Sequence, residues 1–516
     1  MGIQFYPRGG SAQVARYLLC ALRDAGWTVS LAAGSLGPPG LETNADTFFQ
    51  GLDVNAVDYT ASSRAFDAGD DPFAVADPMH PSYEDRADVP DRLLASVAPE
   101  LGARLTASWE GPFAAAGIEH ADVVHLHHLT AQQDAVKKRW PTLPVVAHLH
   151  GTELKFLESV NERIELARAV GHSLATIHRA ASEGTLDLGP LDPPQRNLFD
   201  TSRWGEWRHG EYWRTRLLHQ AQAADQLVTV SPADRETALT LLGIEPSRVS
   251  AIPNGVETDR FSPVHLSSEE RRAHFRHWLV GDPQGWDRSS KPGSVAYSEA
   301  DLDRLLGVDG HDPVLIYVGR FTQAKRVPLL IRAFARARQL AARPLSLIIW
   351  GGHPGEWEGE HPVDVARVVG DEGIYFAGWR GHHDLPAGLA ACDALVMPSV
   401  NDSFAGTALE AMAVGLPVLA TQSGGFPSMI NLDPARPTGW LIAPDDLEAL
   451  TDALLDLVSH PSDVAERGRH ALAHAHANLS WEGRVPAFET AYAQAIEHCK
   501  GRSDAARISR SRSQDR

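Results

Sequence analysis

The chain has 516 residues, 43% of them hydrophobic, and a formal net charge of -19 at pH 7. A chain of this length and composition can bury a large core, and we expect two domains plus insertions. The acidic balance excludes binding to nucleic acid or to an anionic membrane by broad electrostatic attraction, although it leaves room for a local basic patch.

Cysteine usage and hydropathy narrow the class of protein further. Cys20, Cys392 and Cys499 are scattered, which predicts neither a disulfide framework nor a zinc knuckle and favours the reducing cytoplasm. The sequence has no run of about 18 uncharged apolar residues and no basic segment followed by an apolar one at its start, so we expect a soluble protein without a membrane span or signal peptide. It also has no internal repeat and no Walker-type turn, which excludes solenoids and kinase-like NTPases.

The chain opens with a predicted strand over residues 1–7, a glycine pair and a helix. The residues that share the apolar face of this helix are Val14, Tyr17, Leu18 and Ala21. A turn of this kind can hold a phosphate, because the first N–H groups of a helix have no partner within it. A tight turn without a ligand explains Gly9 and Gly10 equally well, so the glycine pair alone leaves both interpretations open.

Two buried strands are predicted over residues 123–126 and 145–149, after a second strand over 28–33 and an irregular segment with short strands over 34–117. Each buried strand carries histidines at or beyond its end. These are His125, His127 and His128 in the first and His148 and His150 in the second. A metal site is one interpretation. We favour no metal, because no cysteine or spaced pair of carboxylates accompanies the histidines and because alternation places His125 and His127 on one face and His128 on the other.

The segment His150-Gly151-Thr152-Glu153 is predicted to form a strand-to-helix loop. Such loops bind ligands in parallel α/β proteins. A capping loop with Thr152 as the N-cap of the next helix is the alternative.

A long helix over 156–181 and a proline-rich break over 189–195 precede an aromatic group. Its members are Trp204, Trp207, Tyr212 and Trp213. We interpret them as packing of an inserted helix, with a wall that stacks against an acceptor as the alternative. A strand over 225–231 and the turn at Asn254-Gly255 then mark a domain junction. The charged segment 265–312 is predicted to be an insertion made of a helix and a surface loop.

The second domain begins with an apolar strand over 314–318. The loop after it carries Gly319, Arg320 and Lys325. A guanidinium fork and an ammonium at the carboxyl end of a parallel strand suit a diphosphate. A solvated pair of surface charges is the alternative. Further strands are predicted over 345–350 and 374–377, the latter followed by Gly378-Trp379-Arg380.

The stretch 393–425 predicts a strand, a polar loop, a helix, a second strand and a glycine turn, which together form a βαβ unit. Asp402 lies in the loop and Glu410 about one turn into the helix, beside its apolar stripe. A carboxylate in such a place needs hydrogen-bond donors, which sugar hydroxyls supply.

This stretch resembles the retaining glycosyltransferases of family four, which have the GT-B fold and carry two glutamates separated by seven residues. Glu410-Ala411-Met412 and Gly415-Leu416-Pro417 match the family motif as they stand. The first glutamate falls on Asp402, and Ala405 replaces the usual glycine after Phe404.

The resemblance implies an α/β fold of two doubly wound, Rossmann-like domains that face a cleft. Residues 1–255 would bind the acceptor and 313–480 the nucleotide sugar, with 256–312 as linker and insertion. A last helix over 481–498 would pack back on the first domain. The Ser/Arg-rich segment 501–516 is predicted to be a disordered tail from its composition.

The implied activity is transfer of a sugar from a nucleotide sugar, most often a UDP-sugar, to a soluble small-molecule or glycan acceptor, with retention and without a metal or other cofactor. The residues implied in catalysis are His150, Arg320, Lys325 and Asp402. Those implied in donor binding are Gly9, Gly10, Gly319, Arg320, Lys325, Gly378, Trp379, Arg380, Asp402, Phe404, Ala405, Gly406, Leu409 and Glu410.

Other activities are compatible with the same fold. A GT-B epimerase, a phosphorylase and a partner protein that has lost activity are the alternatives. A phosphorylase needs a pyridoxal lysine, and Lys155, Lys325 and Lys500 lack a supporting context. The departures at Asp402 and Ala405 are the features that favour an inactive partner. The sequence leaves the acceptor and the oligomeric state open.

Overall fold

The computed structural model of the chain describes residues 1–86, 89–307 and 309–514, with side chains to Arg502. It divides into two compact units. Unit 1 comprises Met1–Pro253 and Val485–Arg516, and unit 2 comprises Asn254–Arg484. No helix in the described part of the chain combines the length and the apolar character that a membrane crossing requires.

Unit 1 is built on a seven-stranded sheet with the order β3-β2-β1-β4-β5-β6-β7, and every pair in it is parallel. Its strands are β1 (Gly2–Ile3), β2 (Leu31–Ser35), β3 (Val54–Asp58), β4 (Val124–His127), β5 (Val145–Leu149), β6 (Gln226–Thr229) and β7 (Val249–Ala251). The strand predicted over 1–7 is therefore too long. It ends early because the carbonyl of Gln4 accepts the hydroxyl of Tyr59 at 2.9 Å instead of joining the ladder.

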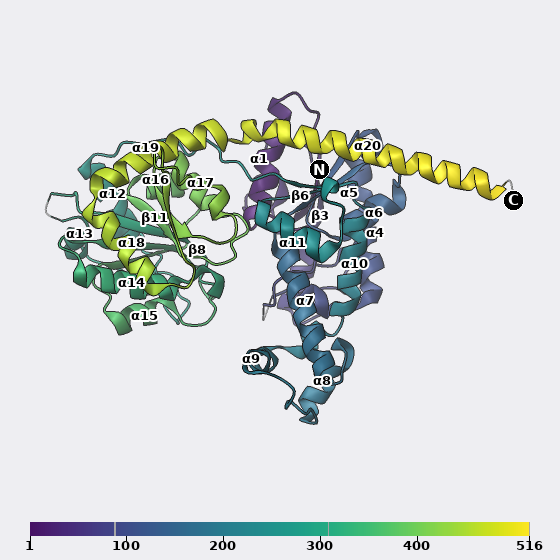
Figure 1. The fold of residues 1–516 in the computed structure, drawn as a ribbon, viewed down its shortest axis with the longest axis horizontal. Coiled ribbons are helices and arrows are strands. Elements are labelled where there is room, and N and C mark those ends of the chain that lie inside the picture. Colours follow the sequence, from purple (N-terminus) through teal and green to yellow (C-terminus); the bar gives the residue numbers. More distant parts are fainter. Residues whose placement is uncertain (87–88, 308, 515–516) are drawn as a thin grey trace. The chain divides into compact units, whose positions relative to one another are not determined.

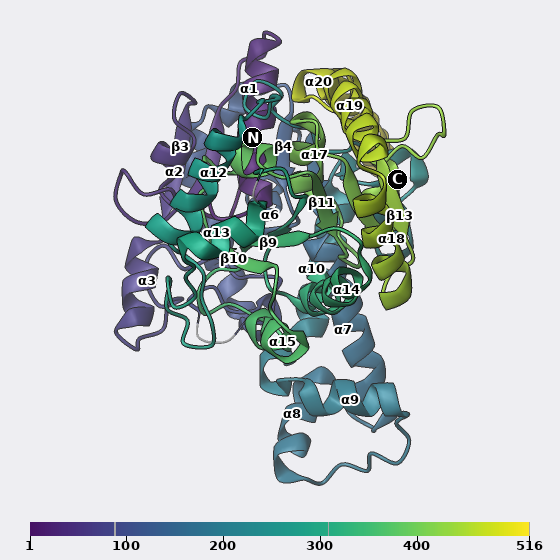
Figure 2. The same ribbon diagram turned by 90° about the vertical axis from the view of Figure 1, so that its left-hand side faces the viewer.

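Helices cover both faces of this sheet (Figure 1). The helices of unit 1 are α1 (Gly10–Asp24), α2 (Ala45–Phe48), α3 (Thr60–Asp67), α4 (Gly102–Ala107), α5 (Glu110–Ala115), α6 (Ala131–Arg139), α7 (Thr152–Ala169), α8 (Leu174–Glu183), α9 (Pro193–Thr201), α10 (Gly210–Ala223), α11 (Pro232–Leu242) and the part of α20 (Trp481–Gln514) from Val485 onward. The helix predicted over 156–181 is two helices, because Gly171 has a φ of 78° and Ser173 begins α8 with a capping box. Figure 2 shows α8 and α9 beyond the end of α7, away from the sheet.

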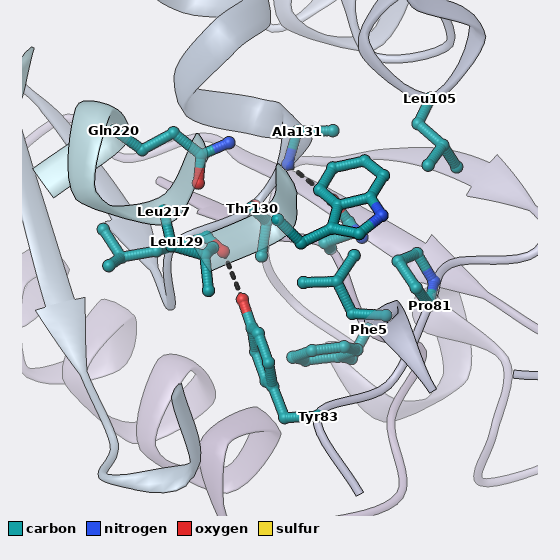
Figure 3. Close-up of a pocket in the computed structure, with 12 residues that line it drawn as sticks. Phe5, Pro81, Tyr83, Leu105, Leu129, Thr130, Ala131, Leu217 and Gln220 are labelled. Carbon is teal, nitrogen blue, oxygen red and sulfur yellow. Dashed lines mark hydrogen bonds between the residues drawn. The ribbon is translucent and has the colours of Figure 1, made fainter. Parts of the chain in front are cut away.

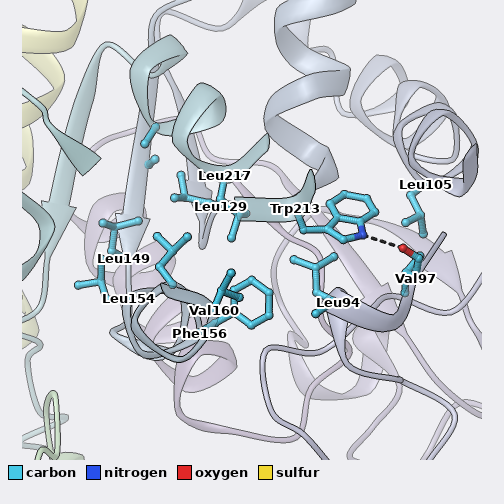
Figure 4. Packing of buried hydrophobic residues seen from close by; sticks show 14 of the residues in the cluster. Leu94, Val97, Leu105, Leu129, Leu149, Leu154, Phe156, Val160, Trp213 and Leu217 are labelled. Carbon is cyan, nitrogen blue, oxygen red and sulfur yellow. Dashed lines mark hydrogen bonds between the residues drawn. The ribbon is translucent and has the colours of Figure 1, made fainter. Parts of the chain in front are cut away.

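The aromatic group of unit 1 packs into the core, as predicted. Trp204, Trp207 and Trp213 are buried, and Tyr212 is 39% exposed. Figure 4 shows Trp213 against Leu94 and Leu105, with its indole N–H donating to the carbonyl of Val97 at 2.8 Å. Three of the four rings are thus enclosed and cannot stack against an acceptor.

Unit 2 is built on a six-stranded, wholly parallel sheet with the order β10-β9-β8-β11-β12-β13. Its strands are β8 (Val314–Gly319), β9 (Ser346–Gly351), β10 (Ile374–Gly378), β11 (Ala394–Met397), β12 (Val418–Thr421) and β13 (Gly439–Ile442). Its helices are α12 (Ser268–Arg276), α13 (Glu299–Leu306), α14 (Val327–Leu340), α15 (Pro362–Val369), α16 (Leu385–Ala390), α17 (Gly406–Ala413), α18 (Leu447–Ser459) and α19 (Pro461–Asn478).

Alternation along the strands gives unit 2 one core on each face of its sheet. Ile316 and Leu395 pack with α17 and α19 on one face, whereas Tyr317 and Val396 pack with α14 and α18 on the other. Both faces are apolar, which is the pattern of a parallel sheet covered by helices on both sides.

The insertion over 265–312 is part of the core of unit 2 rather than a helix with a surface loop. Trp278 and Trp286 are buried. The indole N–H of Trp286 donates to the carbonyl of Gly352 at 2.7 Å, and the hydroxyl of Tyr297 accepts from the N–H of Phe376 in β10 at 2.7 Å. The insertion therefore covers β10, an edge strand whose free N–H groups would otherwise be open to pairing with another chain.

Helix α20 continues to Gln514 (Figure 1). After Gly501 the described segment contains no further glycine and no proline, the two residues that most oppose a helix. A disordered tail over 501–516 stays a prediction.

Candidate donor site and strand-end loops

The two charged loops of unit 2 meet at the carboxyl ends of β8 and β11. Lys325, in the loop after β8, forms an ion pair with Asp402, in the loop after β11. The side chains are 22% and 16% exposed. The N–H of Val400 also donates to the carbonyl of Ala324 at 2.8 Å. The structure thus brings together a cation and a carboxylate that are 77 positions apart in the chain.

Gly319 and Arg320 form the start of the first loop. The carbonyl of Gly319 accepts from the N–H of Gly352 at 3.0 Å, and the hydroxyl of Tyr317 donates to the carbonyl of Arg320 at 2.8 Å. These bonds fix the backbone from which the half-buried Arg320 side chain extends. Burial raises the pKa of Tyr317 well above its ordinary value, so its hydroxyl stays protonated and remains a donor.

A glycine turn supports the loop that carries Asp402. Gly424 has a φ of 58°, and a Cβ there would lie 2.1 Å from the carbonyl oxygen of Asp402. The N–H of Gly425 donates to that same oxygen at 2.8 Å. Only glycine allows this approach, which explains why the predicted βαβ unit ends in two glycines.

Helix α17 begins directly after this loop. Ala405 is its N-cap and provides no side-chain hydrogen bond, so the first N–H groups of the helix lack a side-chain cap. Gly406 begins the helix, and Phe404 is half-buried beside it. The side chain of Leu409 is fully buried in the core of unit 2, and its part in donor binding stays a prediction.

Glu410 faces away from that core. One of its carboxylate oxygens, Oε1, lies 2.8 Å from Nε2 of His382. The two side chains are 16% and 24% exposed. Glu410 therefore lies at the edge of the protein surface, as its place beside the apolar stripe predicts.

The residues after β10 are placed differently from the prediction. Trp379 is 48% exposed. Arg380 instead turns inward, with its side chain 3% exposed. Its guanidinium donates to the carbonyl of Trp278 at 2.7 Å and to Asp282, both in the insertion. The insertion thus holds the two terminal nitrogens of the Arg380 guanidinium, and a part for Arg380 in donor binding stays a prediction.

In unit 1 the glycine pair lies at the start of α1. Gly9 is the N-cap, its φ of -157° is extended backbone that any residue adopts, and no side chain caps the helix. A Cβ on Gly9 or Gly10 would meet nothing within 4 Å. The pair is thus not required by a tight turn, and it leaves the first N–H groups of α1 accessible.

His150 lies in the loop between β5 and α7. Gly151, with a φ of 88°, is the N-cap of α7, so the expectation that Thr152 is the N-cap is wrong. Burial lowers the pKa of His150 well below its ordinary value, so the ring is neutral at pH 7. A neutral imidazole keeps both a donor and an acceptor nitrogen.

Sequence reasoning missed the part played by Glu153. Its buried carboxylate accepts from the N–H of His150 at 3.1 Å and lies 3.2 Å from Nδ1 of His128. His128 itself has a φ of 64°, which non-glycine residues rarely adopt. The signal that was available is a glutamate one residue into a helix, where an acid is favoured by the dipole.

The other histidines form a cluster on one face of the unit 1 sheet. His125 Nε2 lies 3.2 Å from His148 Nδ1, and His127 Nδ1 lies 2.8 Å from His150 Nε2. The hydroxyl of Tyr492, from α20, contacts His125 at 2.8 Å. Burial lowers the pKa of His125 and of His127 well below the ordinary value, and that of His148 to about 3.

Among the described residues, His125, His127 and His148 are a group whose ligand atoms lie within 4.8 Å of one another, which is a candidate arrangement for a metal ion. Their nitrogens contact one another, Tyr492 and the sulfur of Met1. These contacts occupy most of the ring nitrogens of the three histidines without a metal ion. The absence of a metal site stays a prediction.

A small cavity lies beside Phe5 and Tyr83 in unit 1 (Figure 3). The hydroxyl of Tyr83 donates to the carbonyl of Leu129 across its lower side. Its volume is about 20 Å³, room for about one water molecule. It is too small for a sugar acceptor.

Both units match known families. Residues 8–260 match the family model described as Glycosyltransferase Family 4, and residues 312–460 match the one described as Glycosyl transferases group 1. The D-inositol 3-phosphate glycosyltransferase of Corynebacterium efficiens is 28% identical over 353 residues, which cover 65% of this chain and 81% of that protein. Other curated relatives of the same name are matched over 54%, 60% and 58% of their length, so the chain spans little more than half of them.

Solved structures show the same fold. Sucrose-phosphate synthase from Thermosynechococcus elongatus aligns with a TM-score of 0.57 and 18% identity, covering 95% of this chain and 94% of its own. HepE from Anabaena, in complex with UDP, aligns with a TM-score of 0.55 and 14% identity, covering 95% and 98%. The predicted GT-B fold is confirmed.

Proposed function

We propose, from the premise that this chain belongs to the family 4 glycosyltransferases, that it transfers a sugar from a UDP-sugar to a soluble small-molecule or glycan acceptor with retention of the anomeric configuration. A neighbour of the same fold is described in complex with UDP, which supports this choice of nucleotide. The scattered cysteines of the sequence support the cytoplasm as the compartment of the reaction.

The observation that carries the proposal is the pairing of two carboxylates with two cationic or ionisable side chains around the start of α17. Lys325 holds Asp402, and His382 holds Glu410. A nucleotide sugar presents a diphosphate, which competes for Lys325, and hydroxyls, which are donors for the carboxylates. One such ligand can therefore replace the ion pair between Lys325 and Asp402 with new hydrogen bonds to both side chains.

The first step of the proposed mechanism is an exchange of partners. The donor diphosphate binds Lys325 and Arg320 and releases Asp402, which then accepts hydrogen bonds from hydroxyls of the transferred sugar. Glu410 accepts from the ribose. Because Asp402 and Lys325 neutralise each other before the donor binds, neither leaves an uncompensated charge in a partly buried loop.

The chemical step replaces the bond from the anomeric carbon to the diphosphate oxygen with a bond to the acceptor oxygen. We propose that attack occurs on the same face, and that the departing phosphate oxygen takes the proton of the acceptor hydroxyl. Arg320, Lys325 and the first N–H groups of α17 stabilise the charge on the leaving diphosphate, as preorganised donors do in other enzymes. In this mechanism a metal ion and other cofactors are dispensable.

Unit 1 has candidate groups of its own. His150, neutral and held by Glu153 through its backbone, is proposed to contact a sugar, and Gly9 and Gly10 leave room for a phosphate at α1. The relatives are named for D-inositol 3-phosphate, so an inositol phosphate is the first acceptor to test.

The test is an incubation of the full chain with UDP-, GDP- and ADP-sugars, with and without inositol phosphates, in which release of the free nucleotide is measured. We expect slow release of UDP from one UDP-sugar alone and faster release with a true acceptor. An epimerase would convert the nucleotide sugar without net release, and an inactive partner protein would do neither. Either result would overturn the proposed function.

A further inference from the structure

His382 lies in the loop between β10 and α16 of unit 2. Its Nε2 is 2.8 Å from Oε1 of Glu410 in α17, and its ring packs against Phe261 with the two ring centroids 5.3 Å apart. The loop, the helix and Phe261 all belong to unit 2. The pair is therefore held by three separate segments of one compact unit.

The contact decides which nitrogen carries the proton. Because Nε2 faces a carboxylate oxygen, the N–H of His382 lies on Nε2 and donates to Glu410. The other nitrogen, Nδ1, is buried and has no hydrogen-bond partner among the described residues. The structure thus gives His382 one polar contact, and that contact is with the carboxylate that the proposed function assigns to the ribose.

Donation to Oε1 also fixes the orientation of the carboxylate. A glutamate on a helix surface samples several rotamers, and ordering it when a ligand binds costs free energy. With Oε1 held by His382, the second oxygen of Glu410 stays directed to one place before any ligand arrives. Preorganisation of this kind raises affinity without adding a contact to the ligand.

We propose that His382 is a positioning residue of the ribose subsite, which orients Glu410 so that it selects ribonucleotides over deoxyribonucleotides. This inference rests on the proposed function, because it takes Glu410 as the acceptor for the ribose hydroxyls. It adds a residue from the loop after β10, outside the Glu410-Ala411-Met412 motif that carries the resemblance.

The neighbouring His383 offers a matched control. Its side chain is 73% exposed and lies 3.5 Å from Asp384 rather than near Glu410. His383→Ala removes the same ring from the same loop without touching the carboxylate. A change in the loop backbone alone would affect both variants, whereas loss of the bond to Glu410 affects only His382→Ala.

The experiment measures binding of UDP and of 2′-deoxy-UDP by calorimetry to the parent, His382→Ala, His382→Gln, His383→Ala and Glu410→Ala. We expect the parent to bind UDP about tenfold more tightly than 2′-deoxy-UDP, since a hydrogen bond to a carboxylate is involved. In His382→Ala this preference should shrink to roughly twofold. His382→Gln, whose amide can donate to the carboxylate, should restore most of it, and His383→Ala should keep the parent value.

A double variant completes the test. If His382 acts through Glu410, then His382→Ala combined with Glu410→Ala should bind UDP no more weakly than Glu410→Ala alone. Equal loss of both nucleotides in His382→Ala, with an unchanged preference, would assign His382 to structure only and overturn the inference while the function stands. A parent that fails to bind UDP, or whose affinity is insensitive to Glu410→Ala, would overturn the proposed function and the inference together.

Discussion

Both units carry polar residues near the carboxyl ends of their parallel strands, but unit 2 has charged side chains there and unit 1 has neutral ones. In unit 2 these residues form partly exposed pairs, Lys325 with Asp402 and His382 with Glu410. In unit 1 they are buried or half-buried histidines whose pKa values are held low by desolvation, so they are neutral. Unit 2 thus has charged side chains that can bind an anionic ligand, whereas unit 1 has imidazole rings with lowered pKa values.

Removal of a cation from unit 2 should have the largest effect. We expect Arg320→Ala and Lys325→Ala each to lower kcat/KM by about 10² to 10³, because each group meets the leaving diphosphate. Nucleotide release at saturating and limiting donor measures it. Arg326→Ala is the control, because that side chain pairs with Asp445 at 3.0 Å instead. Activities within about twofold of the parent in both test variants would remove these residues from the site.

The two carboxylates of unit 2 should separate binding from turnover. Glu410→Ala should weaken UDP binding by about tenfold or more, since it loses charge-assisted bonds to the ribose. Asp402→Ala should keep UDP binding, because it only frees Lys325, but should lose turnover and sugar selectivity. Calorimetry with UDP, beside single-turnover assays, tests this. An equal loss of UDP affinity in both variants would end the division of labour between them.

A fall in pH should destabilise unit 1 before unit 2. The folded pKa of His148, about 3, lies below the value of 6.5 of an unfolded histidine, so the unfolded chain binds protons first as pH falls. The stability contributed by such a group is full above pH 6.5 and is lost between 6.5 and about 3. For each unit by which the pH falls in this range, each buried histidine should lower the free energy of unfolding by up to about 1.4 kcal/mol.

Urea unfolding at pH 7, 6 and 5 measures this slope. His148→Gln should flatten it, whereas His353→Gln, an exposed histidine of unit 2, should leave it unchanged. A stability that does not vary between pH 7 and 5 would contradict the neutral state of the cluster.

A smaller effect is expected from lengthening the shorter carboxylate. Asp402→Glu restores the residue usual in the family and extends the carboxylate by one methylene, so it should shift the preference between donor sugars by roughly an order of magnitude or less. Competition between pairs of UDP-sugars measures the ratio. An unchanged ratio would show that Asp402 does not contact the sugar.

The smallest effect is expected from metal removal. If Arg320, Lys325 and the α17 N-terminus stabilise the diphosphate, nucleotide release should be the same in excess EDTA as in Mg²⁺ or Mn²⁺. Loss of activity in EDTA with rescue by either ion would contradict the metal-independent mechanism.

Local sequence patterns predicted many of the strands and helices that carry the candidate site residues. The strand Val145–Leu149 has the predicted bounds, and β8 and α17 lie where apolar runs and helical spacing indicate. Glu410 lies at the surface edge for the same reason. These features depend on residues close in sequence, whose periodicity reports burial directly.

Contacts between residues far apart in the sequence could not be predicted from such patterns. Arg380 follows a strand as donor-binding residues do, yet its guanidinium bonds to Asp282, 98 positions earlier. Lys325 and Asp402 were predicted separately, and no periodicity indicated that they pair. The long segment 34–117, predicted to be irregular with short strands, contains β3 but also α2, α3, α4 and α5 among its described residues, because short helices with few apolar residues are stabilised by tertiary packing rather than by their own pattern.

The contact of Tyr492 with His125 has a consequence for how the chain matures. The two residues are 367 positions apart, and at about 5 to 20 residues per second a ribosome takes roughly 20 to 70 s to pass from one to the other. The continuous segment of unit 2 is completed within that interval, while the histidine face of unit 1 waits for α20. Unit 1, although it is synthesised first, is therefore expected to finish folding last, and its uncovered sheet face is the surface that a chaperone would need to protect during translation.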